Sequence, residues 1–305
     1  KMEDETPTKS LKAIITIGIP CSGKSTWAED FCEEEDYVEI NRDNLRMEMF
    51  ELGHYDDYKF SKGNEQKVTE AAEAAITVCV ATNRNVVVSD TNLNKGRREA
   101  LERRLDALGY EVSYKVFDIE FFDALKRNDK RSDKHIPRSA MYSMYRSFMT
   151  YKEEQGEWTK HVNDNNLPSA YIVDIDGTIA TNTGSRGFYD WDKVGLDGPI
   201  QTTIDVVKTL FDGGHYVILL TGRDERSKQE TEKWLYEYDV PYHAMYMRPE
   251  GSMEKDRYVK HKLFIDHVAS KHSIKGVFDD RPQVCLLWHD LGLPVFKVGD
   301  PIIEF

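Results

Sequence analysis

Short apolar runs alternate with helical patterns along this sequence, and the alternation restarts near residue 170. The apolar runs are rich in β-branched residues, which favours strands. The predicted strands cover residues 11–17, 37–40, 86–89, 111–117, 170–173, 216–220, 242–247, 275–278 and 295–298. The apolar run 86–89 indicates a central parallel strand. Because strand–helix alternation favours a parallel sheet wrapped by helices, the sequence predicts an α/β fold with two doubly wound parallel-sheet domains.

The stretch 155–169 separates the two alternations. It is rich in Asn, Asp and Gly, it shows no periodicity, and Pro168 lies near its end. We therefore expect a first domain over residues 1–154, a linker over residues 155–169 and a second domain over residues 170–305.

The composition is that of an ordinary soluble protein, with 40% hydrophobic and 31% charged residues. The cysteines are Cys21, Cys32, Cys79 and Cys285. They form no C-x-x-C pair and no cluster with zinc spacing, so we expect reduced thiols in a cytoplasmic protein. Residues 1–9 are polar and the apolar run 13–20 is short, so neither a secretory signal nor a membrane segment is expected.

The net charge of −13 argues against a protein that coats long nucleic acid. Two basic clusters remain as candidates for local grooves. The four arginines of residues 97–104 alternate with Glu99 and Glu102, which favours a solvated helix face. The second cluster consists of Lys126, Arg127, Lys130, Arg131, Lys134 and Arg138. It lies between two predicted helices, where a lid would carry an arginine to a transferring phosphoryl group; a solvated helix end is the alternative.

Residues 18–25, with the sequence GIPCSGKS, fit the phosphate-binding pattern G-x-x-x-x-G-K-[ST] between a predicted strand and a predicted helix. Gly18 and Gly23 let the backbone turn so that N–H groups face phosphate oxygens. Lys24 would place a cation on the β- and γ-phosphates of ATP, and Ser25 would offer a hydroxyl to Mg²⁺. With Thr26, these residues predict a nucleotide site. A glycine-rich turn without function is the alternative.

Polar residues follow the next two predicted strands, at the sheet edge where ligands of open α/β folds bind. Asp43 is placed to accept a proton from an attacking hydroxyl as a general base, although a helix N-cap is the alternative. Arg46, one turn later, would hold an anionic group of the acceptor. Asp90 ends the third strand, in the position of a carboxylate near Ser25 and the metal.

The second domain opens with Asp174-Ile-Asp176-Gly177-Thr178 after an apolar strand. This D-x-D-G-T motif resembles the first motif of the haloacid-dehalogenase superfamily. Asp174 would attack phosphorus as the nucleophile. Asp176 would protonate the leaving oxygen and then activate water.

Further parts of that site follow in order along the chain. Thr221 would donate to phosphoryl oxygens, and Lys260 would neutralise the aspartyl-phosphate. Asp279 and Asp280 end a strand, and their carboxylates would hold Mg²⁺ together with Asp174 and Asp176. Taken singly, each of these residues could be a surface charge or a cap.

The order of these motifs resembles the phage polynucleotide kinase–phosphatase family. The resemblance spans about residues 11–300 and rests on the phosphate-binding loop, on NRDNLR at 41–46, VVVSDTNLN at 86–94, KRNDKR at 126–131 and GSRGFYD at 184–190. It implies a P-loop kinase fold followed by a haloacid-dehalogenase-like Rossmannoid fold with a small cap. It also implies Asp43 as the base on a polynucleotide 5′-hydroxyl, Arg46 on the acceptor phosphate and Arg131 on the donor phosphates. Thr91 would lie near the acceptor nucleobase.

The same resemblance implies Arg186 and Arg223 as ligands of the phosphatase substrate, and Asp256 as a further functional position. We therefore expect a kinase of polynucleotide 5′-hydroxyls and a 3′-phosphatase that heals DNA or RNA ends for a separate ligase. A homo-oligomer in a phage-infected host cell is also implied. Two alternatives stay open: a kinase–phosphatase that acts on a small metabolite, and a nucleotide-gated binding module with inactive sites.

Overall fold

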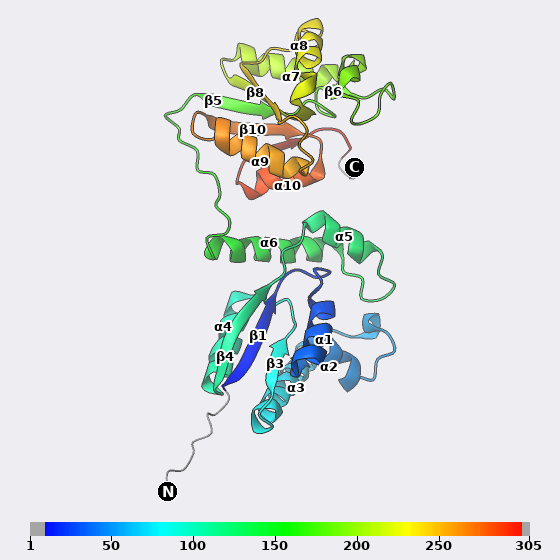
Figure 1. Cartoon of the computed structure of the whole chain (residues 1–305), viewed down its shortest axis with the longest axis vertical. Helices are drawn as coiled ribbons and strands as arrows, with labels where there is room; N and C mark the ends of the chain where they lie inside the picture. The colour runs from blue at the N-terminus through cyan, green and yellow to red at the C-terminus, as the bar shows by residue number, and fades with distance from the viewer. Residues whose placement is uncertain (1–9, 301–305) are drawn as a thin grey trace. The chain divides into compact units, whose positions relative to one another are not determined.

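The computed structural model describes residues 10–300, and the chain forms two compact units that divide between Trp158 and Thr159. Each unit is built on a parallel sheet with helices, so the predicted fold class of two α/β domains is confirmed (Figure 1). Residues 1–9, where no secretory signal is expected, lie outside the described residues. None of the helices in the described range 10–300 is both long and apolar enough to cross a bilayer.

The first unit alternates strands and helices along the chain. Its elements are β1 (Leu11–Ile17), α1 (Lys24–Glu35), β2 (Tyr37–Ile40), α2 (Arg42–Met49), the 3-10 turn η1 (Tyr55–Asp57), α3 (Lys62–Ala81), β3 (Asn85–Val88), α4 (Lys95–Ala107), β4 (Tyr110–Val116), α5 (Phe121–Asp129) and α6 (Arg138–Glu154). The strands are parallel in the order β2-β3-β1-β4, so β3 is an inner strand as predicted. Buried side chains of β1 and β3 pack against Ile76 of α3 and Leu105 of α4. This packing fixes the strand ends that carry the polar motifs.

The second unit repeats the alternation. Its elements are β5 (Ser169–Val173), β6 (Ala180–Thr181), η2 (Trp191–Leu196), β7 (Gly198–Pro199), α7 (Gln201–Asp212), β8 (Tyr216–Asp224), η3 (Glu225–Ser227), α8 (Lys228–Glu237), β9 (Ala244–Arg248), α9 (Asp256–His267), β10 (Ser273–Asp279), α10 (Pro282–Asp290) and β11 (Val295–Lys297). The parallel strands follow the order β11-β10-β5-β8-β9. Strands β6 and β7 form a separate antiparallel pair. At two residues each, they are too short for a hydrophobic period, and the sequence analysis missed them.

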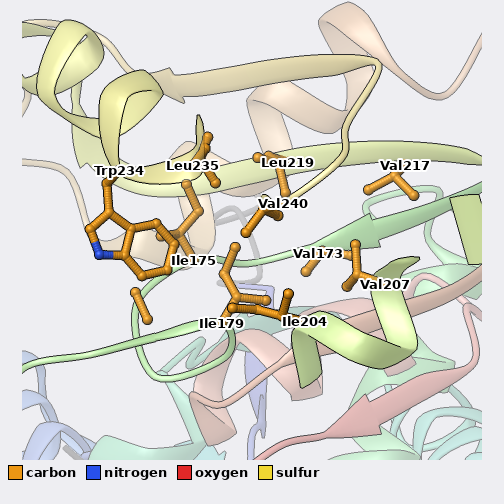
Figure 2. Packing of buried hydrophobic residues seen from close by; sticks show 11 residues of the cluster. Val173, Ile175, Ile179, Ile204, Val207, Val217, Leu219, Trp234, Leu235 and Val240 are labelled. Atoms are coloured by element: carbon orange, nitrogen blue, oxygen red, sulfur yellow. The ribbon is translucent and has the colours of Figure 1, made fainter. Parts of the chain in front are cut away.

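A hydrophobic cluster holds the central strands of the second unit in place. Val173 of β5 and Leu219 of β8 pack with side chains of α7 and α8, including the fully buried Trp234 (Figure 2). The indole of Trp234 also donates a hydrogen bond to the backbone oxygen of Asp197 at 2.7 Å. Since β5 is central, this core fixes the position of Asp174, the residue directly after the strand.

The stretch predicted as a linker makes specific contacts with the second unit. The side chain of Asn163 donates to the backbone oxygen of Ile274 at 2.8 Å and accepts from the N–H of the same residue at 2.7 Å. The N–H of Ser273 donates to the oxygen of Pro168 at 2.9 Å. An asparagine that pairs with a strand more than 100 residues away leaves no local pattern in the sequence.

Candidate active sites

The phosphate-binding loop connects β1 to α1. Gly23 is the N-cap residue of α1 and has a φ of 98°, in the left-handed region that favours glycine. A Cβ on Gly18 would lie 2.8 Å from the backbone oxygen of Phe117. Lys24 is buried, its Nζ donates to the oxygen of Ile19 at 2.7 Å, and burial lowers its pKa to about 8. The ammonium group is therefore held inside the loop, while Ser25 lines the adjoining cleft.

Asp43 lies in the first turn of α2, but the cap of this helix is Asn41, whose Oδ1 accepts from the N–H of Asp43 at 2.9 Å. The carboxylate of Asp43 lines the cleft instead. Its Oδ1 accepts from Arg46 at 2.6 Å and from the hydroxyl of Tyr55 at 2.7 Å, and its Oδ2 pairs with Lys134. Burial raises the pKa of Asp43, but Lys134, Tyr55 and Arg46 together hold it below its usual value. The cap alternative is therefore wrong, and Asp43 is an ionised carboxylate in the cleft.

Arg46 is held in a fixed orientation beside that carboxylate. Its Nε and Nη2 donate to Glu65 at 3.0 and 2.8 Å, and its guanidinium carbon lies 5.5 and 5.3 Å from the ring centroids of Tyr58 and Phe60. Hydrogen bonds from Arg46 and from the Tyr58 hydroxyl lower the pKa of Glu65 to about 2. The sequence analysis missed Glu65, because it lies on α3 and no motif links it to α2.

The basic cluster predicted as a lid lies between α5 and α6. The buried amide of Asn128 shapes this segment, since it donates to the oxygen of Ile136 at 2.8 Å and accepts from its N–H at 3.0 Å. Arg127 donates to the oxygen of Cys21 in the phosphate-binding loop at 3.1 Å. Arg131 donates to the oxygen of Lys134 at 3.3 Å, and both residues line the cleft.

One cleft of about 1520 Å³ joins these parts of the first unit. Its lining includes Gly23, Lys24, Ser25, Thr26, Asp43, Arg46, Asp90, Thr91 and Arg131. Asp90 accepts from the N–H of Arg42 at 3.0 Å, and burial raises its pKa to about 6. The backbone oxygen of Thr91 accepts from the N–H of Gly18 at 3.2 Å. The cleft is larger than the ~300–1000 Å³ typical of a site for one small ligand, so a donor and an acceptor have room together.

One arginine of α4 departs from the predicted solvated face, whereas Arg97 and Arg103 are exposed as expected. Arg98 is buried, donates to the oxygen of Asn92 at 2.8 Å and lies over the ring of Tyr151. Arg97 and Arg104 line the cleft. The alternating glutamates suggested full exposure, but the helix turns one arginine inward to bind the loop after β3.

In the second unit, Asp174 follows β5 and is almost fully buried. Its Oδ1 accepts from Nζ of Lys260 at 2.8 Å. Lys260, on α9 and equally buried, also contacts Asp279 at 2.9 Å and Asp256 at 3.6 Å. Burial raises the pKa of Asp174 well above its usual value, and Lys260 opposes this effect. One ammonium group is therefore shared by three carboxylates, of which Asp256 also pairs with two arginines.

Carboxylate oxygens of Asp174, Asp279 and Asp280 lie within 4.8 Å of one another. Oδ1 of Asp280 is buried with no hydrogen-bond partner among the described residues, and burial beside Asp279 raises its pKa to about 6. A Cβ on Gly177 would lie 2.0 Å from Asp280, so only glycine permits this approach. An oxygen-only set of this kind fits a hard divalent cation. Asp176, expected among the ligands, is outside this group of three.

The carboxylate of Asp176 faces two arginines instead. Arg186 and Arg223 donate to its Oδ1 at 3.0 and 2.8 Å, and both also donate to Asp197 at 2.8 Å. Arg186 and Arg223, expected as substrate ligands, therefore lie at the site and are oriented by carboxylates of the same chain. Asp197 was missed because it follows the short turn η2 and belongs to no motif.

Thr221 and Asp256 complete the second site. Thr221 is buried in β8, and its hydroxyl accepts from the N–H of Arg223 at 3.1 Å. Asp256 lies 3.3 Å from Arg248 and from Arg281, besides its contact with Lys260. Contacts through Lys260 thus link Asp174 to Asp256 and Asp279, while Asp176 pairs with the two arginines and Thr221 contacts the backbone of Arg223.

Two parts of the chain match models of known families. Residues 168–301 match the family described as the polynucleotide kinase PNKP phosphatase domain. Residues 14–150 match the family described as the AAA domain. The two matches correspond to the second and the first unit.

Related proteins extend over both units. The chain is 34% identical over 309 residues to the "Putative bifunctional polynucleotide kinase/RNA ligase" of Autographa californica nuclear polyhedrosis virus, in an alignment that covers 97% of this chain and 44% of that protein. The chain thus spans less than half the length of that viral relative. Chains in two structures of the Pnkp1/Rnl/Hen1 complex are 29% and 30% identical and cover 99% and 97% of this chain, and this chain covers 100% and 99% of them, with TM-scores of 0.46 and 0.45.

Proposed function

Because this chain belongs to the polynucleotide kinase–phosphatase family, we propose that it heals the ends of broken nucleic acid. It transfers the γ-phosphate of ATP to a 5′-hydroxyl and removes phosphate from a 3′ end. The observation that carries the proposal is that each unit gathers, at its strand ends, charged residues of the kind that phosphate transfer would require. The name of the viral relative includes an RNA ligase, which supports RNA as the substrate polymer.

In the kinase reaction, Asp43 accepts the proton of the 5′-hydroxyl while the 5′ oxygen bonds to the γ-phosphorus of ATP. The bond from that phosphorus to the β–γ bridging oxygen breaks, and ADP leaves. Lys24 and Arg131 neutralise charge on the transferring phosphate, and Arg46 holds the first internal phosphate of the acceptor. The hydrogen bonds that keep Asp43 ionised support its assignment as the base.

In the phosphatase reaction, a carboxylate oxygen of Asp174 bonds to phosphorus and the bond to the 3′ oxygen breaks. Asp176 gives its proton to that oxygen, which leaves as a hydroxyl. Asp176 then takes a proton from a water molecule whose oxygen attacks the aspartyl-phosphate, so that inorganic phosphate is released. Thr221 and Lys260 bind the phosphoryl oxygens, while Arg186 and Arg223 hold Asp176 and the substrate.

Each site also needs a cation, which we propose is Mg²⁺. Asp174, Asp279 and Asp280 would hold it in the second unit, and Ser25 with Asp90 would do so in the first. A bound divalent ion would neutralise charge on the phosphate oxygens. Oδ1 of Asp280, which is buried and has no hydrogen-bond partner among the described residues, supports the assignment in the second unit.

We further propose that a ligase seals the ends that this enzyme prepares. The name of the viral relative includes both a polynucleotide kinase and an RNA ligase, and that protein is more than twice as long as the matched region. The small-metabolite alternative gains no support from the comparisons. The homo-oligomeric state and the bacteriophage source stay predictions.

The test of the proposed function is incubation with labelled ATP and oligonucleotides that carry a 5′-hydroxyl and a 3′-phosphate, as RNA and as DNA. We expect label at the 5′ end and loss of the 3′-phosphate. Kinase kcat/KM should rise from a nucleoside to its 3′-monophosphate by roughly ten- to a hundred-fold, the value of a charge-assisted contact to Arg46. Equal kcat/KM for a nucleoside and an oligonucleotide would support the metabolite alternative instead.

A further inference from the structure

The hydroxyl of Tyr55 makes a contact that no motif predicts. It donates to Oδ1 of Asp43 at 2.7 Å, beside the bond from Arg46 at 2.6 Å. These two donors fix one carboxylate oxygen from two directions. The second oxygen, Oδ2, pairs only with the ammonium group of Lys134 among the described residues. The two oxygens of Asp43 thus have different surroundings, since Oδ1 accepts from two donors and Oδ2 faces one lysine.

The position of Tyr55 is itself fixed from the lid side of the cleft. Its backbone N–H donates to Asp133 at 2.9 Å, and the N–H of Asp56 donates to the other oxygen of the same carboxylate at 3.2 Å. The ring of Tyr55 packs near Phe60, and the ammonium of Lys134 lies 4.9 Å from its centroid. A tyrosine held by its backbone, ring and hydroxyl has little freedom to turn away from Asp43.

We propose that Tyr55 is a positioning residue of the kinase: with Arg46 it fixes Oδ1 of Asp43, so that Oδ2 is the oxygen that accepts the proton of the attacking hydroxyl. The inference rests on the proposed kinase function. Lys134 occupies Oδ2 when no acceptor is bound, and the acceptor hydroxyl takes its place. A carboxylate with both oxygens free to rotate would spend less time in the geometry that proton transfer requires.

Three charged groups and the neutral hydroxyl of Tyr55 set the proton affinity of Asp43. Arg46 faces it from α2, Lys134 from the lid segment and Asp90 from the end of β3. The cations favour the ionised form, and Asp90 opposes it. Removing the Tyr55 hydroxyl takes away a donor to the ionised form, so the pKa of Asp43 should rise.

The experiment compares Tyr55→Phe with Tyr58→Phe in the full chain, under single-turnover conditions with an oligonucleotide acceptor across a pH series. Phenylalanine keeps the ring contacts of either position. Tyr55→Phe should lower the rate of phosphoryl transfer about tenfold, the lower end for a hydrogen bond to a charged group, with little change in acceptor KM. The acid limb of its pH–rate profile should move to higher pH. Tyr58→Phe is the matched control, since its hydroxyl donates to Glu65 at 2.9 Å; its acid limb should stay in place.

A double variant excludes a merely structural effect. If Tyr55 acts through Asp43, then adding Tyr55→Phe to Asp43→Asn should change the rate by less than twofold. The two substitutions would remove the same catalytic contribution, so their effects should not add. Three results would overturn the inference: a wild-type rate and acid limb in Tyr55→Phe, equal shifts of the acid limb in both tyrosine variants, or a tenfold further loss in the double variant. A wild-type chain without kinase activity would instead refute the proposed function.

Discussion

The two sites surround their central carboxylates, Asp43 and Asp174, in opposite ways. In the first unit, the side chain of Asp43 is 27% exposed, and Arg46, Tyr55 and Lys134 lower its pKa. In the second unit, the side chain of Asp174 is 5% exposed among other carboxylates, and its pKa is raised well above the usual value. The carboxylate that we propose as the kinase base is therefore kept ionised by groups of the protein, whereas burial opposes ionisation of the proposed phosphatase nucleophile, and a bound cation would favour it.

The difference follows from the two chemical tasks. A general base needs an accessible oxygen and a proton affinity matched to the operating pH. An aspartate nucleophile is best held in a buried site from which water is excluded, and a bound cation would add positive charge to that of Lys260. Each of the following predictions tests one side of this contrast.

The largest expected effect is the complete separation of the two activities. Lys24→Ala should lower 5′ phosphorylation by about 10⁴-fold or more and leave 3′-phosphate removal near the wild-type rate, because the two residues that matter lie in different units. Asp174→Ala should do the reverse. Both activities are measured on one oligonucleotide with a 5′-hydroxyl and a 3′-phosphate. A folded variant that loses both would contradict the contrast.

Asp43→Asn should lower the kinase rate by about 10²–10⁴-fold, the usual loss when a general base is removed. The stability of the first unit should change little, because Asn41 rather than Asp43 caps α2. The measurements are single-turnover kinetics and thermal unfolding. Near-normal kinase activity in a stable variant would remove Asp43 from its assigned role.

Lys260→Met tests the buried side of the contrast. Removing the ammonium that pairs with both Asp174 and Asp279 leaves buried charges unpaired, which typically costs about 3–5 kcal/mol of unfolding free energy. Lys134→Met, the counterpart in the kinase cleft, should cost less than about 1 kcal/mol, because that side chain is 31% exposed.

Urea unfolding of the full chain, with and without Mg²⁺, measures both effects. Lys262→Met is the matched control, since Lys262 is exposed on the same helix as Lys260 and should leave stability near the wild-type value. Equal losses for Lys260→Met and Lys134→Met would show that burial does not distinguish the two sites.

Much of this arrangement could be predicted from the sequence because the motifs are local. The loop 18–25 and the D-x-D-G-T motif each contain the residues that their geometry requires, and a strand end fixes both in place. Apart from the two-residue strands β6 and β7, the order of strands and helices followed from the pattern of apolar and β-branched residues. Glu65 and Asp197 could not be found in this way, because each buttresses an arginine of another element and neither lies in a motif.

The ligand set of the metal and the cap of α2 show a second limit of local patterns. A D-x-D spacing says that two carboxylates lie near a strand end, but side-chain direction decides that Asp280 joins Asp174 while Asp176 faces Arg223. An aspartate at the start of a helix likewise has two possible roles until the neighbouring Asn41 is seen to supply the cap. Tertiary contacts decide between such alternatives.

The smallest expected effect concerns the buttress of Arg46 and its dependence on pH. The pKa of Glu65 is about 2 in the folded chain, against a usual value of 4.5, with hydrogen bonds from Arg46 as the main cause. A carboxyl group whose pKa falls on folding stabilises the protein above its unfolded pKa and loses this effect as pH drops toward the folded value. Glu65→Gln should therefore cost about 1 kcal/mol at pH 6, the upper end for partly exposed ion pairs, and progressively less between pH 4.5 and pH 2.

Urea unfolding at pH 6, 4 and 3 gives the difference in unfolding free energy from wild type. Glu34→Gln on the exposed side of α1 is the control, which should show little difference at any pH. The same difference at pH 6 and pH 3 would mean that the pair between Arg46 and Glu65 does not depend on the ionised carboxylate, and the kinase cleft would then lack the self-contained charge balance that distinguishes it from the phosphatase site.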